Sequence, residues 1–302
     1  MLERLLVPLD AGPVAEQVLP YVTLLAKRLG QPVVLLSVVA DGDELNPVAT
    51  MYEAEIADLM EKRRAYAQRY LDSIRAQLER EGVWATVEVA TGPVAETILA
   101  AASEHRAGLI AMATHGRVGP ERWFLGSVAD RVVHAASVPV LLVRPRDDGP
   151  LTEAVVNEIL LPLDGSPLAE VALPYATFLA QRCEVPIRLI QTFPLTWLST
   201  VGADAYGYAA PPEVLTALEE DVRQYLERTA EKLRVSGVDA STEFAFRVPD
   251  QAITERAAAS GGALVVMSSH GRSGLGRTLL GSVTDRVIRS SEAPVLVVRE
   301  VS

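Results

Sequence analysis

The chain has 302 residues, and 49% hydrophobic with 22% charged residues is typical of a folded globular protein rather than a disordered one. A net charge of −11 without any cluster of Lys or Arg argues against a nucleic-acid surface or an anionic membrane surface. It leaves room for a small phosphate site made from backbone N–H groups. Cys183 is the only cysteine, which excludes an intramolecular disulfide and a cysteine-rich metal site.

The N-terminal segment MLERLLVPLD contains Glu3, Pro8 and Asp10, and so lacks the long apolar stretch of a signal peptide. No run of about 18 apolar residues, the length needed to span a membrane, occurs anywhere in the sequence. We therefore expect a cytoplasmic protein without a membrane segment.

Short apolar runs alternate with helically spaced apolar residues along the first half of the chain. The pattern predicts strands at 5–9, 32–39, 83–90, 109–113 and 140–144, and helices at 14–29, 54–81, 93–105 and 127–136. The uninterrupted apolar run at 32–39 is typical of a strand covered on both faces of a parallel sheet. Strands interleaved with helices in this way predict a doubly wound α/β domain with right-handed crossovers.

The second half of the chain repeats the first. Residues 5–33 align without a gap with residues 159–187 at an offset of 154. Residues 114–144 align with residues 269–299 at an offset of 155, with 17 of 31 positions identical. Similarity at both ends of each half indicates a duplicated domain. We expect domains at 1–147 and 148–302, joined through the Pro-, Gly- and Asp-rich segment 144–153.

Ligands of doubly wound sheets bind beyond the carboxyl ends of the strands, where the strand order reverses. Pro8 and Asp10 follow the first predicted strand, and Pro162 and Asp164 are their counterparts in the second half. The loops 113–127 and 268–282 follow the fourth predicted strand of each half. The sequence therefore predicts a binding site in each half, between these two places.

Each of these loops ends in a glycine and a serine that open a helix: Gly126–Ser127 and Gly281–Ser282. The serine is expected at the N-cap. The free N–H groups and partial positive charge of a helix start attract an anion, and a glycine lets a phosphate approach the backbone. The alternative is purely structural, in which the glycines end a strand and the serine caps a helix.

Both halves resemble the universal stress protein domain, whose nucleotide-binding members carry G-x2-G-x9-G-[S/T]. The resemblance covers essentially the whole chain in tandem. The second glycine falls on Gly116 and Gly271, and the third falls on Gly126 and Gly281. The first falls on Ala113 and Ser268, which depart from the pattern but remain small.

The resemblance implies an adenine nucleotide α-hydrolase-like fold, with a five-stranded parallel sheet and four helices in each domain. It implies ATP or AMP as ligand, with or without Mg²⁺. Asp10 and Asp164 would contact ribose hydroxyls or a phosphate-bound metal, and His115 and His270 would belong to the phosphate loop. The implied nucleotide site comprises Pro8, Asp10, Val38, Met112, Ala113, His115, Gly116, Gly126, Ser127 and Val128, with Pro162, Asp164, Thr192, Met267, Ser268, His270, Gly271, Gly281, Ser282 and Val283 in the second half.

The function implied is that of a nucleotide-binding stress-response or regulatory protein without committed turnover. Two alternatives stay open: a slow ATPase or adenylate-handling hydrolase on the same scaffold, and an interaction module that binds no nucleotide. No G-x4-G-K-[S/T] motif is present to support P-loop hydrolysis. The apolar last strands of the two domains are expected to pair inside one chain, because free apolar edges aggregate. A homodimer of the whole chain is a further open alternative.

Overall fold

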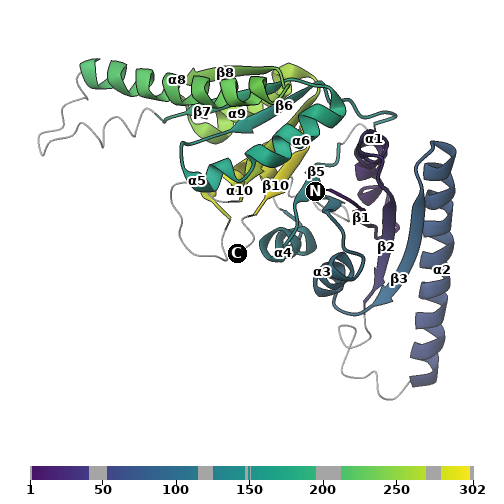
Figure 1. Cartoon of the computed structure of the whole chain (residues 1–302). Coiled ribbons are helices and arrows are strands. Elements are labelled where there is room, and N and C mark those ends of the chain that lie inside the picture. The colour runs from purple at the N-terminus through teal and green to yellow at the C-terminus, as the bar shows by residue number, and fades with distance from the viewer. Residues whose placement is uncertain are drawn as a thin grey trace, which may run out of the picture. The chain divides into compact units, whose positions relative to one another are not determined.

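The computed structural model describes residues 2–40, 53–114, 125–146, 149, 151–194, 212–269 and 280–299. The chain divides into two compact units, Met1–Ala154 and Val155–Ser302 (Figure 1). The linker expected at 144–153 immediately precedes this division.

The first unit alternates strands and helices in the order that its hydrophobic pattern predicts. Its elements are β1 (Leu5–Pro8), η1 (Ala15–Val18), α1 (Leu19–Leu29), β2 (Val33–Val39), α2 (Glu53–Arg80), β3 (Ala85–Thr91), α3 (Val94–Glu104), β4 (Leu109–Ala113), α4 (Ser127–Ala135) and β5 (Val140–Val143). The helix predicted at 14–29 is divided into a 3₁₀ turn, η1, and the α-helix α1. Pro20 sits in the first turn of α1, where its missing N–H removes no intrahelical bond.

The sheet of the first unit has the strand order β3-β2-β1-β4-β5, and its neighbouring strands pair in parallel. β1 is paired on both sides, so that Leu5 lies opposite Val33 of β2 and opposite Leu109 of β4. The chain winds outward from β1 through β2 to β3, then returns to β4 on the other side of β1. The strand order therefore reverses between β1 and β4.

The second unit repeats this plan. Its elements are β6 (Glu158–Pro162), α5 (Pro167–Glu170), α6 (Leu173–Cys183), β7 (Ile187–Thr192), α8 (Pro212–Val235), β8 (Ala240–Ala245), α9 (Pro249–Ser260), β9 (Ala263–Ser268), α10 (Ser282–Ser290) and β10 (Val295–Val298). Its strand order is β10-β9-β6-β7-β8, again in parallel, with the reversal between β6 and β9. The doubly wound α/β prediction is confirmed in both units.

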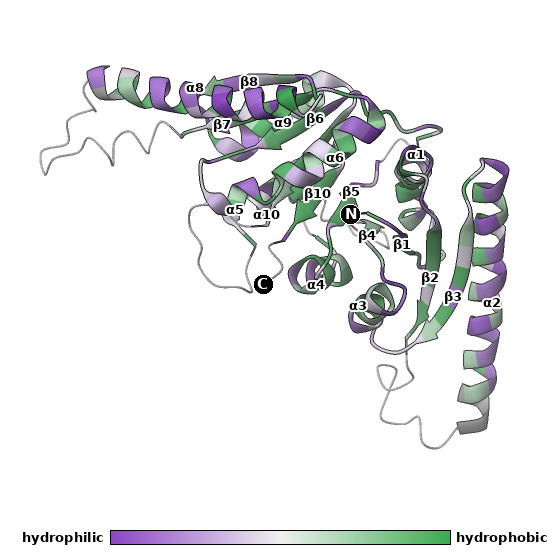
Figure 2. Ribbon diagram, in the orientation of Figure 1, coloured by the Kyte–Doolittle hydropathy of each residue, from purple (hydrophilic) through white to green (hydrophobic). Residues whose placement is uncertain are grey.

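Hydrophobic residues fill the strands, and helices cover both faces of each sheet, as α2 and α3 do on either side of β2 and β3 (Figure 1). The long helices α2 and α8 are hydrophilic except on the side facing the sheet (Figure 2). The buried apolar residues of α2 recur at helical spacing: Ala67, Leu71, Ile74 and Leu78. Among the described residues, no helix combines the length and apolarity that crossing a membrane requires.

Gly108, just before β4, lies against the N-terminal backbone. A Cβ atom at this position would lie 2.6 Å from the amide nitrogen of Glu3 and 2.8 Å from Cα of Leu2. We therefore expect Gly108→Ala to shift the backbone and to lower the free energy of unfolding by about 1–3 kcal/mol, as measured by urea denaturation.

Gly262→Ala is the matched control, because the three atoms nearest to its Cβ would belong to the side-chain amide of Asn157, which can turn away, and not to the backbone. We expect a smaller loss there. Equal stability of Gly108→Ala and the parent protein would contradict the packing described at this position.

Candidate functional site

A cavity of about 450 Å³ lies in the first unit beyond the carboxyl ends of β1, β2 and β4. It occupies the point at which the strand order reverses, where doubly wound sheets bind ligands. The residues predicted from sequence that line it are Pro8, Asp10, Val38, Met112, Ala113, Gly126, Ser127 and Val128. They come from four separate elements and the turn after β1, and the fold brings them together.

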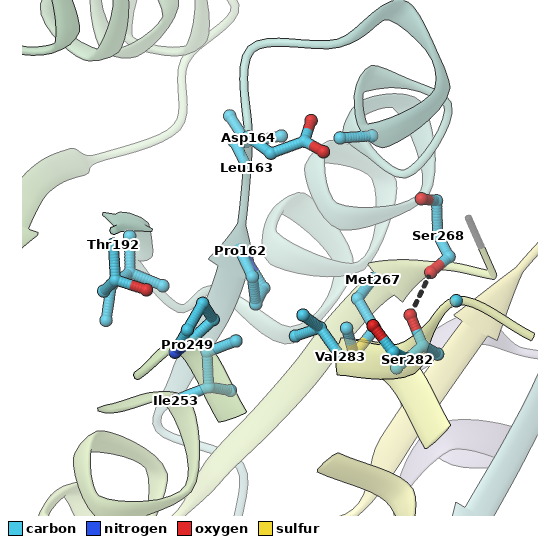
Figure 3. Close-up of a pocket in the computed structure, with 14 residues that line it drawn as sticks. Pro162, Leu163, Asp164, Thr192, Pro249, Ile253, Met267, Ser268, Ser282 and Val283 are labelled. Carbon is cyan, nitrogen blue, oxygen red and sulfur yellow. Dashed lines mark hydrogen bonds between the residues drawn. The ribbon is translucent and has the colours of Figure 1, made fainter. Parts of the chain in front are cut away.

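The second unit has a cavity of about 260 Å³ in the corresponding place. In the view of Figure 3, Thr192 and Ser282 lie on opposite sides of it, with Pro162 between them. The predicted residues that line it are Pro162, Asp164, Thr192, Met267, Ser268, Gly281, Ser282 and Val283. The remaining predicted residues, His115, Gly116, His270 and Gly271, lie outside the described residues.

The N-termini of α4 and α10 border these cavities. The N-cap residues are Gly126 and Gly281, not the serines that follow them. The predicted N-cap position is therefore wrong by one residue, because Ser127 and Ser282 already have helical backbone. A glycine has no side chain to accept a bond from the first turn, so these helix starts carry N–H groups without a side-chain cap.

Backbone conformation does not explain why the N-caps are glycines. Gly126 has φ −59° and ψ 146°, and Gly281 has φ −61° and ψ 143°, values that any residue adopts. What glycine supplies here is the missing Cβ at the edge of the cavity. This favours the interpretation that something must approach the backbone closely.

A short backbone hydrogen bond fixes each helix start to the neighbouring strand. Gly126 N–H donates to the carbonyl oxygen of Thr114 at 2.8 Å, and Gly281 N–H donates to that of Ser269 at 2.7 Å. Because Thr114 directly follows β4 and Ser269 directly follows β9, the helix N-terminus is held at the carboxyl end of the strand. The direction of its N–H groups is set by the sheet.

Asp10 and Asp164 are held by matching turns. One carboxylate oxygen of Asp10 accepts from Gly12 N–H at 2.9 Å, and one of Asp164 accepts from Ser166 N–H at 2.9 Å. The residue between has positive φ in both units, 60° at Ala11 and 81° at Gly165. The sequence predicted these aspartates at the site, and the turns explain how each carboxylate is oriented beside its cavity.

Ala113 and Ser268 replace the first glycine of the family pattern. They are the last residues of β4 and β9, and neither has a positive φ. A side chain at this position therefore strains no backbone. The departure from the pattern changes the lining of the cavities without disturbing the strands.

A tyrosine–glutamate pair beside each aspartate could not be seen in the sequence. Tyr225 of α8 donates to Oε1 of Glu170 at 2.8 Å. Burial first, and then the hydrogen bond and charge of Glu170, raise the pKa of Tyr225, with a further contribution from Asp164. Burial and then the nearby Glu16 likewise raise the pKa of Tyr70, the counterpart on α2. The bond from Tyr225 to Glu170 holds α8 to the segment that follows Asp164, whereas the buried hydroxyl of Tyr70 has no hydrogen-bond partner among the described residues.

The helices that follow the third strands supply a wall that sequence analysis did not assign to the site. Val94 and Ile98 of α3 line the first cavity, and Pro249 and Ile253 of α9 line the second. The order of the predicted elements could have indicated this wall. The helices of a doubly wound sheet are divided between its two faces, and α3 lies on the same face as α4, as α9 does with α10.

His105 and His134 of the first unit are half-buried. A ring nitrogen of His105 contacts the carboxylate of Glu88, and Nδ1 of His134 lies 2.7 Å from the carbonyl oxygen of Asp130. Neither residue lines a cavity described above. In the described part of the chain, no group of three or more His, Cys, Asp or Glu side chains is placed to hold a metal ion.

Tyr225→Phe tests the tyrosine–glutamate pair. A tyrosine whose pKa is higher in the folded than in the unfolded state contributes stability that is present below pH 10 and lost as the pH rises further. We expect the variant to be less stable than the parent by about 1 kcal/mol at pH 8, with a difference that shrinks above pH 10. Urea denaturation of the variant and the parent, at pH 8 and again above pH 10, measures the two differences in the free energy of unfolding.

Tyr66→Phe is the control, since Tyr66 of α2 is exposed, and it should leave stability unchanged at either pH. A stability difference between Tyr225→Phe and the parent that does not vary with pH would contradict the expected titration.

Comparison with known proteins identifies the family. The family model for universal stress proteins matches residues 1–144 and again residues 156–299. A universal stress protein of Mycolicibacterium smegmatis is 28% identical over 302 residues, covering 98% of this chain and 96% of that protein. One from Mycobacterium tuberculosis is 29% identical over 201 residues, covering 65% of this chain and 63% of that protein, less than two thirds of its length.

The fold agrees with a solved structure of nearly equal extent. The crystal structure of a universal stress protein from Archaeoglobus fulgidus superposes with a TM-score of 0.70 at 21% identity, covering 98% of this chain and 96% of that one. The two family matches fall on the two compact units. The chain therefore belongs to the universal stress protein family, with one family domain in each half.

Proposed function

We propose that the chain binds an adenine nucleotide, ATP or AMP, in the cavity of each unit and acts in stress response or regulation without committed turnover. The observation that carries the proposal is the glycine-capped helix N-terminus beside each cavity. Membership of a family whose nucleotide-binding members carry this loop pattern supports it.

The start of α4 suits the phosphates. An α-helix leaves the N–H groups of its first turn without intrahelical acceptors, and they carry a partial positive charge. In α4 these N–H groups belong to Ser127, Val128 and Ala129, and all three residues line the cavity. Phosphate oxygens would accept hydrogen bonds from them, and the missing Cβ at Gly126 allows the approach. α10 offers the same arrangement behind Gly281.

The opposite side of each cavity suits a purine base. Apolar side chains from the second strand, the helix after the third strand and the fourth strand form this wall in the first unit: Leu36, Val38, Val94, Ile98 and Met112. In the second unit the apolar residues of this wall are Ile190, Pro249, Ile253 and Met267, and Thr192 adds a methyl group and a hydroxyl. Mostly apolar walls with a few fixed polar groups are typical of small-molecule sites.

The aspartates suit the sugar or a phosphate-bound metal. Among the described residues lining each cavity, Asp10 and Asp164 are the carboxylates. Each is held by its turn, so little ordering is needed on binding. A ribose hydroxyl would donate to this carboxylate, or a Mg²⁺ ion accompanying ATP would be held by it together with phosphate oxygens.

Substitution of the capping glycines tests the two sites. We expect the parent chain to bind up to two nucleotides in calorimetric titration, and Gly126→Val or Gly281→Val to remove the site in its own unit. A branched side chain there occupies the space of the phosphate. The loss of two or more charge-assisted hydrogen bonds weakens binding at least about a hundredfold.

Ala135→Val is the matched control, because it places the same branched side chain at the exposed far end of α4, away from the cavity. It should bind nucleotide as the parent does. Titration of the parent with AMP and with Mg·ATP that produces neither heat nor thermal stabilisation would overturn the proposed function. Unchanged binding by the Gly126→Val, Gly281→Val double variant would overturn the proposed phosphate loop.

We also propose that β5 and β10 pair with each other inside one chain. Within its own unit, each lies at an end of the strand order, and each is an uninterrupted aliphatic run. A free edge of this kind exposes unpaired N–H groups and apolar side chains together, which promotes association. Pairing the two edges satisfies both sets of groups without a second chain.

Hydrogen exchange tests this pairing. We expect all backbone amides of β5 and β10 to open with free energies close to that of global unfolding. An unpaired edge would instead leave alternate amides exchanging rapidly. Rapid exchange at alternate residues in a chain that light scattering shows to be monomeric would contradict the pairing. If the amides were protected from exchange only in a dimer, the pairing of these strands would be between two chains and not within one.

A further inference from the structure

The two cavities differ in capacity although the same elements build them. The first holds about 450 Å³ and the second about 260 Å³. Cavities that enclose small ligands measure roughly 300–1,000 Å³, so the first falls inside this range and the second falls below it. A duplicated domain has therefore kept the position of its cavity but not the size.

Aligned lining positions show where the size changes. Thr192 stands where the first unit has Val38, and Ile190 stands for Leu36; these exchanges conserve volume. The exchanges that add atoms lie at the end near the helix N-terminus. Ser268 adds a hydroxyl to the position of Ala113, and Thr284 adds two heavy atoms to the position of Ala129.

Thr284 is fixed where it narrows the cavity. Its side chain is 4% exposed, and its Oγ1 donates to the carbonyl oxygen of Ser268 at 2.9 Å, the bond drawn in Figure 3. Turning the side chain away would break a buried hydrogen bond, which proteins rarely tolerate. The space it fills is therefore closed to a ligand.

We propose that the two sites are not equivalent: the cavity of the first unit is the high-affinity nucleotide site, and Thr284 weakens the second. This inference rests on the proposed function and adds an order of filling to it. An extra carbon-sized group in a fitted pocket alters affinity on the order of tenfold or more, and we expect a difference of at least that size between the sites.

Single-site proteins give the two affinities separately. Gly281→Val leaves the first site, and Gly126→Val leaves the second. Calorimetric titration of each with AMP and with Mg·ATP should show tighter binding by the Gly281→Val protein, by about tenfold or more. Within these backgrounds, Ala129→Thr should weaken the first site and Thr284→Ala should strengthen the second, each by about tenfold.

Thr284→Val separates volume from hydrogen bonding. It keeps the size of the side chain and removes the hydroxyl, so the second site should stay as weak as in its Gly126→Val background. If Thr284→Val strengthened the site as Thr284→Ala does, narrowing by Thr284 would be refuted. Ala129→Thr tests the same size effect without removing any hydrogen bond.

Two negative results have different meanings. Equal affinities in the two single-site proteins would overturn the inference and leave the proposed function standing. Failure of the parent chain to bind either nucleotide would overturn the proposed function and the inference together.

Discussion

The central strand of each sheet, β1 or β6, is hydrogen-bonded in parallel on both sides, and the arrangement of each unit depends on this. Right-handed crossovers that proceed in opposite directions from one strand place their helices on opposite faces of the sheet. The chain segments leaving β1 and β4 therefore diverge above the sheet. This divergence leaves a crevice at the carboxyl ends of the two strands, and polar groups at those ends face it. The crevice is formed by the path of the backbone and not by side chains.

A helix that starts at this crevice brings its own partial charge. α4 and α10 begin directly beside the carboxyl ends of β4 and β9, so their free N–H groups face the crevice. The attraction of a helix terminus for an anion acts within one turn, so it depends on the local N–H groups and does not need a positive net charge of the chain. The fold thus supplies the place and the polarity of each site, while side chains such as Ala129 and Thr284 set its capacity.

The sequence predicts the order of elements well because the strands are uninterrupted apolar runs and the helices have a regular apolar stripe. β4, for example, has the bounds expected from its pattern. Adjacent Gly and Ser are both frequent N-caps, so only the dihedral angles show that Gly126 holds the position. The pair formed by Tyr225 and Glu170 joins residues far apart in sequence, which no local pattern can reveal. The volumes of the two cavities depend on small shifts of several elements and are equally hidden.

The bonds from Gly126 to Thr114 and from Gly281 to Ser269 have a consequence for how the family can diversify. Both partners in each bond are main-chain atoms, so no side chain is needed to hold the helix start against the end of the strand. Side chains that line the cavity can therefore be exchanged, as Ala129 is for Thr284, without moving the helix N-terminus. One backbone frame thus accommodates cavities of different size and lining.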